Sequence, residues 1–427
     1  MDELPKKRGF RQLIAFGKLL SITTLAQIGL QGISFVCGIL IIRTLSIEEY
    51  AYYTLANTMA GTMAVLGDSG IGVGVTSLGG KVWADKNKLG LIIATGLALR
   101  KKFSIVILLI FLPILFALLL QHGASISAAF LISLAILPMF ITELSGKILA
   151  IVPLLRQDIY PLQVINIYTA IFRFFCVCAF IFVLPYATIA ILTAGLVQVW
   201  QNHKLRKLAS AQADLDQKED AVVRHELVQV TKKVLPGALY YCFSGQLTLW
   251  IISALGTTSS LAQFGALSRL TMVFTLMGTL FGTLITPRFA RLPNRRKTIV
   301  LFFFHSQISM FFIVGFITAI TAIFRCQLLF LLGDIYKDLT EALILVVIGG
   351  GLNLIASCIW SVNSARAFLP PWYFNPSMGI TGTIVFASIF DLNTLTGVLF
   401  LNIAMAITII LCTNFVFLYY ILKPIKT

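Results

Sequence analysis

The sequence contains few charged residues. Only 12% of its 427 residues are Asp, Glu, Lys or Arg, about half the usual share of a soluble domain, whereas 58% are apolar. A water-soluble fold of this size cannot hide that much apolar surface, because much of any soluble surface must be polar. The composition therefore excludes a soluble enzyme, a disordered chain and a secreted disulfide scaffold. It favours a polytopic α-helical membrane protein.

The sequence also lacks the residue patterns of a catalytic or metal-binding site. Its four histidines are scattered along the chain without the spacing of metal ligands. A glycine-rich phosphate loop is absent, so we expect no ATP hydrolysis by this chain. Nearly all of the seven cysteines lie inside apolar runs, which is typical of small apolar core residues. We therefore predict a protein that is not an enzyme and that has no cofactor and no metal.

Continuous apolar runs of about 20 residues recur along the chain, and a helix of that length crosses the roughly 30 Å hydrocarbon core of a bilayer. A tight loop at Asp391 and Asn393 separates the last two runs, whose boundaries the sequence leaves open. The twelve predicted spans are 14–42, 50–79, 103–120, 125–152, 160–183, 186–203, 235–255, 261–286, 299–323, 339–364, 376–390 and 394–421.

The 33 Lys and Arg residues are distributed unequally between the gaps that separate these spans. If the N-terminus is cytoplasmic, 26 of them fall in cytoplasmic gaps, 3 in outside gaps and 4 within spans. Basic loops are retained on the cytoplasmic side of a membrane, so we predict an even number of spans and two cytoplasmic termini. We expect the basic gaps to contact anionic membrane lipids and not nucleic acid.

The chain shows signs of an internal duplication. Its longest polar stretch, 204–234, lies near the midpoint and mixes both charge signs with interspersed leucines, which favours an amphipathic helix on the cytoplasmic surface. Tyr50–Ala56 opens the second span, and Phe264–Leu270 opens the eighth span 214 residues later. We therefore predict an N-terminal six-helix bundle over 1–203, a linker over 204–234 and a C-terminal six-helix bundle over 235–427.

Short motifs along the chain resemble those of a known transporter family. The stretch Ile42–Tyr53, with the sequence IRTLSIEEYAYY, resembles the A-R-x-L-G-x-E-x-Y-G-x-Y signature of Wzx-type polysaccharide and O-antigen flippases. Asp68–Ile71 is similar to the D-x-G-[LI] motif of that family near the end of span two. Similar motifs of the second half are Leu235-Pro236-Gly237, Phe264-Gly265 and Pro287-Arg288-Phe289-Ala290. These flippases belong to the multidrug/oligosaccharidyl-lipid/polysaccharide (MOP) exporter superfamily.

The resemblance implies a fold and a function. The implied fold is an all-α polytopic membrane protein with about 12 transmembrane helices, arranged as two six-helix bundles around a cavity that opens alternately to either side (a MATE-like MOP fold). The implied substrate is an oligosaccharide linked to an isoprenoid diphosphate. It would be flipped across the bacterial inner membrane for the synthesis of polysaccharide such as the O-antigen of lipopolysaccharide. The implied partners are a polysaccharide polymerase and a chain-length regulator.

Three departures from the family pattern bear on these implications. Ser46 and Ala51 stand where the family usually carries glycine. Gln246-Leu247 stands where many members have an Asp-Arg-like pair late in span seven, so a charged coupling or substrate role at that position is in doubt.

Basic residues inside the predicted spans are the candidates for binding the diphosphate. A charge inside a membrane helix costs roughly 2.5–3.5 kcal/mol on insertion scales, so its presence requires a reason. Arginine offers a planar fork of donors that suits phosphate oxygens. The candidates for binding the substrate are Arg173, Arg269, Lys147 and Lys18.

Each basic candidate also has a structural explanation. Arg173 lies in the middle of its span and alternatively pairs with Glu143 or Asp68 of another helix. Arg269 and Lys18 alternatively extend toward the membrane surface along their own helices. Lys147 follows Glu143 by four residues, a spacing at which the two side chains form an ion pair on one helix face.

Acidic residues inside the spans are candidates for ion coupling. Asp68 and Glu143 are the intramembrane acids, and each is a candidate for binding a coupling H⁺ or Na⁺. Asp68 is alternatively a helix-end or packing residue beside the neighbouring glycines.

Two other functions compete with the flippase. A drug or small-cation antiporter of the same superfamily needs acidic cavity residues, whereas this chain has more basic than acidic residues within its spans. A membrane polysaccharide polymerase or ligase acts on the same lipid-linked sugars, but such enzymes carry a large extracytoplasmic loop, which the predicted short outside loops leave no room for.

Overall fold

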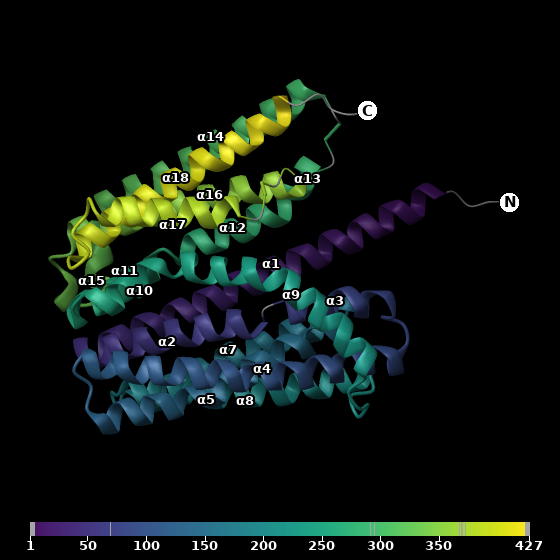
Figure 1. Cartoon of the computed structure of the whole chain (residues 1–427), viewed down its shortest axis with the longest axis horizontal. Coiled ribbons are helices and arrows are strands. Elements are labelled where there is room, and N and C mark those ends of the chain that lie inside the picture. The colour runs from purple at the N-terminus through teal and green to yellow at the C-terminus, as the bar shows by residue number, and fades with distance from the viewer. Residues whose placement is uncertain are drawn as a thin grey trace. The chain divides into compact units, whose positions relative to one another are not determined.

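The computed structural model describes residues 5–422, apart from residues 69, 291, 294, 367, 369 and 372 (Figure 1). These residues are nearly all helical, and the described part of the chain contains no β-strand. The chain divides into two compact units, Met1–Phe243 and Ser244–Thr427. The all-helical class predicted from the apolar runs is confirmed.

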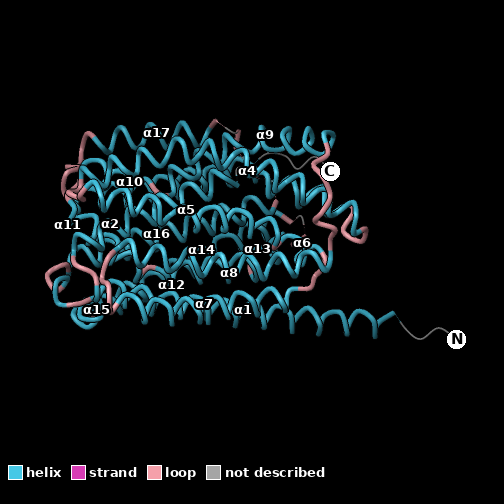
Figure 2. Tube along the Cα trace, turned by 90° about the horizontal axis from the view of Figure 1, so that it is seen from below, coloured by secondary structure: helices cyan, strands magenta, loops and turns pink. Residues whose placement is uncertain are grey.

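The first unit is a bundle of long helices. Within it α1, α5, α7 and α8 run side by side, with α5 against α8 and α7 against both α1 and α8 (Figure 2). Its helices are α1 (Pro5–Thr44), α2 (Ile47–Asp68), α3 (Ile71–Lys81), α4 (Lys86–Gln121), α5 (Ile126–Leu149), α6 (Ile151–Leu155), α7 (Ile159–Ile181), α8 (Ala187–Gln212) and α9 (Ala221–Gly245).

The second unit is built around α16 and α18, which pack against each other, with α14 against α16. The rings of Phe303 and Phe417 stack with their centroids 3.5 Å apart and tie α14 to α18. The elements are α10 (Leu247–Leu255), α11 (Thr258–Leu270), α12 (Met272–Leu284), α13 (Thr286–Ala290), α14 (Arg296–Ile323), α15 (Arg325–Leu332), η1 (Asp334–Tyr336), α16 (Thr340–Ala365), α17 (Phe374–Ala387) and α18 (Leu395–Leu422).

The surface of the helices is apolar. Large side chains such as Leu109, Phe175, Phe312 and Leu411 are exposed although they lie in the middle of long helices. Eight helices of the described chain are long and apolar enough to cross a membrane. Exposed apolar side chains on helices of that length require hydrocarbon around them, so the chain is a multi-pass membrane protein.

Each predicted span coincides with a helix or a pair of consecutive helices, and the structure corrects some of the boundaries. The predicted span 103–120 is the second part of α4, which begins at Lys86 because the Asp85 carboxylate accepts hydrogen bonds from the backbone N–H groups of Asn87 and Lys88. The predicted loop between the last two spans is confirmed, since α17 ends at Ala387 and α18 begins at Leu395.

The predicted span 50–79 is interrupted near its middle. Helix α2 ends at Asp68, and Gly70 adopts a φ of 89° before α3 begins at Ile71. Only glycine takes this left-handed conformation without strain. A Cβ atom at Gly70 would also lie 2.7 Å from the Cβ of Val234 in α9. The glycine therefore allows both the change of helix direction and the close approach of α9.

The stretch 204–234 contains the end of α8, a short loop and the first half of α9. Leu205 and Leu227 from this stretch are buried in one apolar cluster with Leu89 of α4. The backbone N–H of Asp214 donates a 3.1 Å hydrogen bond to the carbonyl of Lys86. The stretch thus packs on the first unit, while its role as a cytoplasmic linker and the bundle boundaries at 203 and 235 stay predictions.

Candidate functional site

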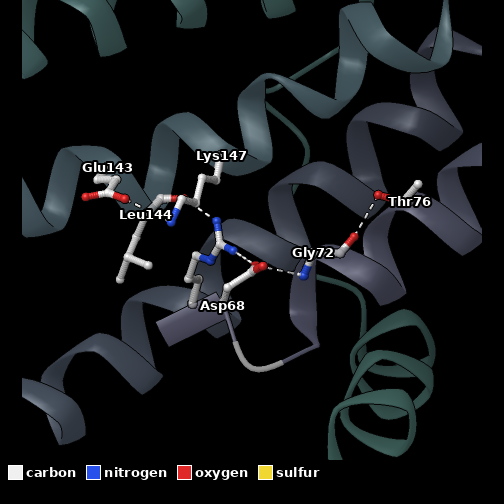
Figure 3. A network of polar contacts seen from close by, with 7 residues as sticks. Asp68, Gly72, Thr76, Glu143, Leu144 and Lys147 are labelled. Atoms are coloured by element: carbon white, nitrogen blue, oxygen red, sulfur yellow. Dashed lines mark hydrogen bonds and ion pairs between the residues drawn. The ribbon is translucent and has the colours of Figure 1, made fainter. Parts of the chain in front are cut away.

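The interruption between α2 and α3 places a carboxylate at a helix start. The Oδ1 atom of Asp68 accepts a 3.2 Å hydrogen bond from the backbone N–H of Gly72 in the first turn of α3 (Figure 3). A negative charge at this position also compensates the unpaired N–H groups and the positive dipole end of α3. Asp68 is therefore in part a helix-end residue, which is one of the two roles that the sequence leaves open.

A buried arginine completes the contacts of Asp68. Arg100 of α4 has a side chain that is only 2% exposed. Its Nη2 donates to Asp68 Oδ1 and its Nη1 donates to the backbone carbonyl of Leu144 in α5. This side chain therefore connects α2, α4 and α5. A buried charge is tolerated when an opposite charge and further hydrogen bonds surround it, and Asp68 and Leu144 satisfy both conditions.

A second ion pair lies one turn along α5. Lys147 Nζ is 2.9 Å from Glu143 Oε1, and both side chains are partly exposed (Figure 3). The pairing predicted from their spacing of four residues is confirmed. Both intramembrane acids of the first unit thus have basic partners, Asp68 with Arg100 and Glu143 with Lys147.

Arg173 differs from these residues. It lies in the middle of α7, is half-buried, and has a buried Nε atom without a hydrogen-bond partner. Neither Glu143 nor Asp68 is its partner, so the interhelical ion pair considered as an alternative is absent. Among the described residues the structure gives this guanidinium no acidic group. A cation in an apolar helix without an anion is the arrangement expected of a ligand-binding residue.

The other two basic candidates are less well defined by their surroundings. Arg269 is half-buried in the last turn of α11, in the second unit. Lys18 belongs to α1, and its side chain lies outside the described residues. The structure therefore brings Asp68 to Arg100 and Glu143 to Lys147. It does not bring the four basic candidates into one described cluster.

Arg100 is the residue that sequence reasoning missed. It lies in the gap between the predicted spans 50–79 and 103–120, next to Lys101 and Lys102. A helical pattern does identify it, since the residues at positions 89, 92, 93, 96 and 100 are all buried and recur at the spacing of one helix face. The same pattern predicts a helix that begins well before position 103.

An aromatic groove lies between α7 and α8, and its lining residues Phe172 and Phe175 are close to Arg173 in the sequence. Its volume is about 590 Å³, and its walls include Tyr168, Phe172, Phe175 and Trp200. The rings of Phe172 and Trp200 are 5.6 Å apart. The Nζ of Lys204 lies 5.5 Å from the centroid of the Trp200 ring, so the groove is apolar along its length and basic at one end.

The described residues contain no group of three His, Cys, Asp or Glu side chains that could hold a metal ion. Among the described candidate residues, Asp68 and Glu143 form ion pairs and Arg173 has no acidic partner. Nothing in this set resembles a nucleophile with its base.

The fold has known counterparts although the sequence has none. No protein-family model and no curated protein matches the chain. An inward-facing multidrug resistance MATE family transporter of the MOP superfamily matches with a TM-score of 0.64 and 15% identity, over 91% of this chain and 93% of that chain. An outward-facing one matches with a TM-score of 0.59 and 16% identity, over 95% and 96%.

A third solved structure is a MOP superfamily transporter from Pyrococcus furiosus, in which the reverse polarity of the binding pocket suggests a different function. It matches with a TM-score of 0.57 and 16% identity, over 95% of this chain and 96% of that chain. The three matches confirm the MATE-like fold expected from the sequence motifs. They are matches of fold, and the flippase subtype stays a prediction.

Proposed function

We propose that this protein is a transporter that flips an oligosaccharide linked to an isoprenoid diphosphate across the bacterial inner membrane by alternating access. The MATE-like fold supports transport, because this fold is known in both an inward-facing and an outward-facing conformation. A sugar and a diphosphate lose several kcal/mol of hydration per polar group in hydrocarbon. Such a head group therefore needs a protein path, whereas its isoprenoid tail does not.

The distribution of charges in the first unit favours an anionic substrate. Asp68 and Glu143 each have a basic partner, so neither is poised to attract a cationic substrate. Among the described residues Arg173 has no acidic partner, and its buried Nε donor has no acceptor. A diphosphate oxygen is an acceptor that satisfies a guanidinium fork with two parallel hydrogen bonds. Arg173 is thus the first residue that we assign to the substrate.

The groove between α7 and α8 supports a lipid-linked substrate. Its aromatic walls, Phe172 and Trp200 among them, suit an unsaturated hydrocarbon chain, and Lys204 at its end suits a phosphate. We assign this groove to the isoprenoid tail while the head group crosses the membrane. Arg269, Lys147 and Lys18 remain further candidates for contacts with the head group.

The competing function is export of drugs or small cations, since the inward-facing and outward-facing matches are described as multidrug resistance transporters. That function requires an acidic residue that exchanges a proton or Na⁺ for the substrate. In this chain the candidate acids Asp68 and Glu143 would have to leave Arg100 and Lys147 first.

Reconstituted vesicles with a fluorescent isoprenoid-diphosphate disaccharide test the proposal. We expect the wild-type protein to move the lipid from one leaflet to the other, measured as protection from a membrane-impermeant quencher. We expect Arg173→Ala to slow this movement about 30-fold, since a hydrogen bond to a charged group contributes about 2 kcal/mol. Lys207→Ala is the control, because Lys207 is an exposed basic residue that does not line the groove.

Two outcomes would contradict the proposal. Normal movement of the lipid by both Arg173→Ala and Arg269→Ala would remove the role of the intramembrane cations. Proton-coupled uptake of a cationic dye by the wild-type vesicles, without movement of the disaccharide lipid, would favour the antiporter.

A further inference from the structure

A second cavity lies in the first unit between α4, α5 and α8. Its volume is about 330 Å³. It shares no lining residue with the groove between α7 and α8. None of the residues proposed to bind the transported substrate lines it, so the proposed function does not account for it.

Three cations and no acid line this cavity. They are Arg100, Lys101 and Arg206. Asp68 neutralises Arg100, so the excess positive charge comes from Lys101 of α4 and Arg206 of α8. Both of these side chains are exposed, and neither forms an ion pair with an acidic residue in the described part of the chain. The excess charge favours an anion as the occupant.

The cavity also contains two buried polar atoms that lack hydrogen-bond partners. One is the Nε donor of Arg100, whose side chain is 2% exposed, and the other is the Oδ1 acceptor of Asn202. A buried polar atom without a partner is destabilising, so the polar groups at this cavity are not fully satisfied within the protein.

The cavity lies where the apolar part of α4 begins. From Phe103 to Leu120 the helix is almost entirely apolar, and these 18 residues span about 27 Å, close to the roughly 30 Å core of a bilayer. Lys101 therefore lies at the level of the lipid phosphates. The basic C-terminal part of α8, with Arg206, reaches the same cavity from the neighbouring helix.

The remaining wall of the cavity is apolar. Leu97, Leu144 and Ile141 line it, and Ile141 is exposed on the outer face of α5. Ile105 and Val106, just after the cavity residues of α4, are exposed as well. An acyl chain that extends from the cavity along these side chains would stay in hydrocarbon.

We propose that this cavity binds one anionic phospholipid of the bilayer, with its phosphate between Lys101 and Arg206 and its acyl chain against Ile141 and Leu144. The positive charge of the cavity suits an anionic head group. The position of Lys101 at the end of the apolar part of α4 suits a lipid phosphate, and the apolar wall of the cavity suits an acyl chain. A bound lipid here holds α4 against α5 and α8 from outside, independently of the transported substrate.

Native mass spectrometry of the purified full-length protein with added phosphatidylglycerol or phosphatidylcholine tests this site. We expect one phosphatidylglycerol to be retained in preference to phosphatidylcholine. Lys101→Gln and Arg206→Gln should each weaken this retention about fivefold, the ratio that corresponds to about 1 kcal/mol per basic side chain near an anionic surface. Lys207→Gln, one residue further along α8 and outside the cavity, should retain the lipid as the wild type does.

A second variant distinguishes binding of the lipid inside the cavity from nonspecific attraction of anionic lipid to basic side chains. Ser145→Phe keeps every charge and fills the cavity beside Ile141, so we expect it to reduce retention of phosphatidylglycerol at least as much as either charge variant. Normal retention by Ser145→Phe, or an equal loss in Lys207→Gln, would overturn the proposal. Displacement of the lipid by inorganic phosphate alone would also overturn it, because the site would then recognise only the anion.

Discussion

Arg100 of α4 and Arg173 of α7 are both arginines in apolar helices of the first unit, and they differ in what surrounds them. Arg100 is almost fully buried and bonded to a carboxylate and a carbonyl from two other helices. Arg173 is half-buried, has a buried Nε donor without an acceptor, and has no acidic partner among the described residues. The first is a structural cation whose charge is compensated within the protein. The second has no described acid to compensate its charge, and we propose that the transported substrate does so. The same residue type therefore serves two purposes, and the partners distinguish them.

The largest effect is expected from removing the partner of the structural arginine. Asp68→Ala leaves Arg100 buried without its carboxylate, and we expect the free energy of unfolding to fall by about 3 kcal/mol. This value is at the lower end of the usual range because the Asp68 side chain is 39% exposed. Thermal unfolding in detergent measures the change. The double variant Asp68→Leu/Arg100→Leu should recover much of the loss, and an unchanged unfolding temperature for Asp68→Ala would remove the contrast between the two arginines.

Arg173→Ala tests the other arginine of this comparison, the one assigned to the substrate. We expect it to impair the proposed lipid transport about 30-fold, as for the loss of one charged hydrogen bond. The unfolding temperature should stay at or above that of the wild type, since no ion pair with a described acidic residue is lost and a buried donor without an acceptor is removed. Transport and thermal unfolding of the same preparation check both parts. Arg173→Lys should recover only part of the transport because an ammonium lacks the planar fork, and a large loss of stability in Arg173→Ala would make Arg173 structural as well.

A smaller effect is expected at the turn that positions Asp68. Gly70→Ala introduces a side chain at a φ of 89° and against Val234, and we expect a loss of about 1–2 kcal/mol in the free energy of unfolding. Gly61→Ala in α2 is the matched control. A Cβ there meets no atom within 4 Å, so this change should be neutral or slightly stabilising. Equal unfolding temperatures for the two variants would show that the turn does not require glycine.

The smallest effect is expected at the partly exposed pair of α5. Lys147→Gln removes the 2.9 Å contact with Glu143, and pairs of this kind contribute about 0.5 kcal/mol or less. The unfolding temperature should therefore change little. A transport defect in Lys147→Gln without any loss of stability would place Lys147 with Arg173 among the residues that contact the substrate.

Much of the helical arrangement follows from local patterns. Apolar runs of about 20 residues locate the helices, because each run has to match the thickness of the bilayer. The spacing of Glu143 and Lys147 predicts their ion pair, since residues four apart share a helix face. The predicted span 103–120 begins later than α4, because the charges of Arg100, Lys101 and Lys102 are typical of a gap between spans. The buried face that includes Leu89 and Gly96 nevertheless continues through this cluster.

The sequence by itself determines the membrane setting, the positions of the helices and the small number of charges within them, because hydrophobicity and helix periodicity act over short distances. It does not determine which charges pair with each other. Asp68 and Arg100 are 32 residues apart and lie on different helices, so their pairing depends on how α2, α4 and α5 pack. The same packing leaves Arg173 without an acidic partner in the described part of the chain and gathers Lys101 and Arg206 at one cavity. Electrostatic compensation acts through space, and only the folded chain decides which charge has a neighbour.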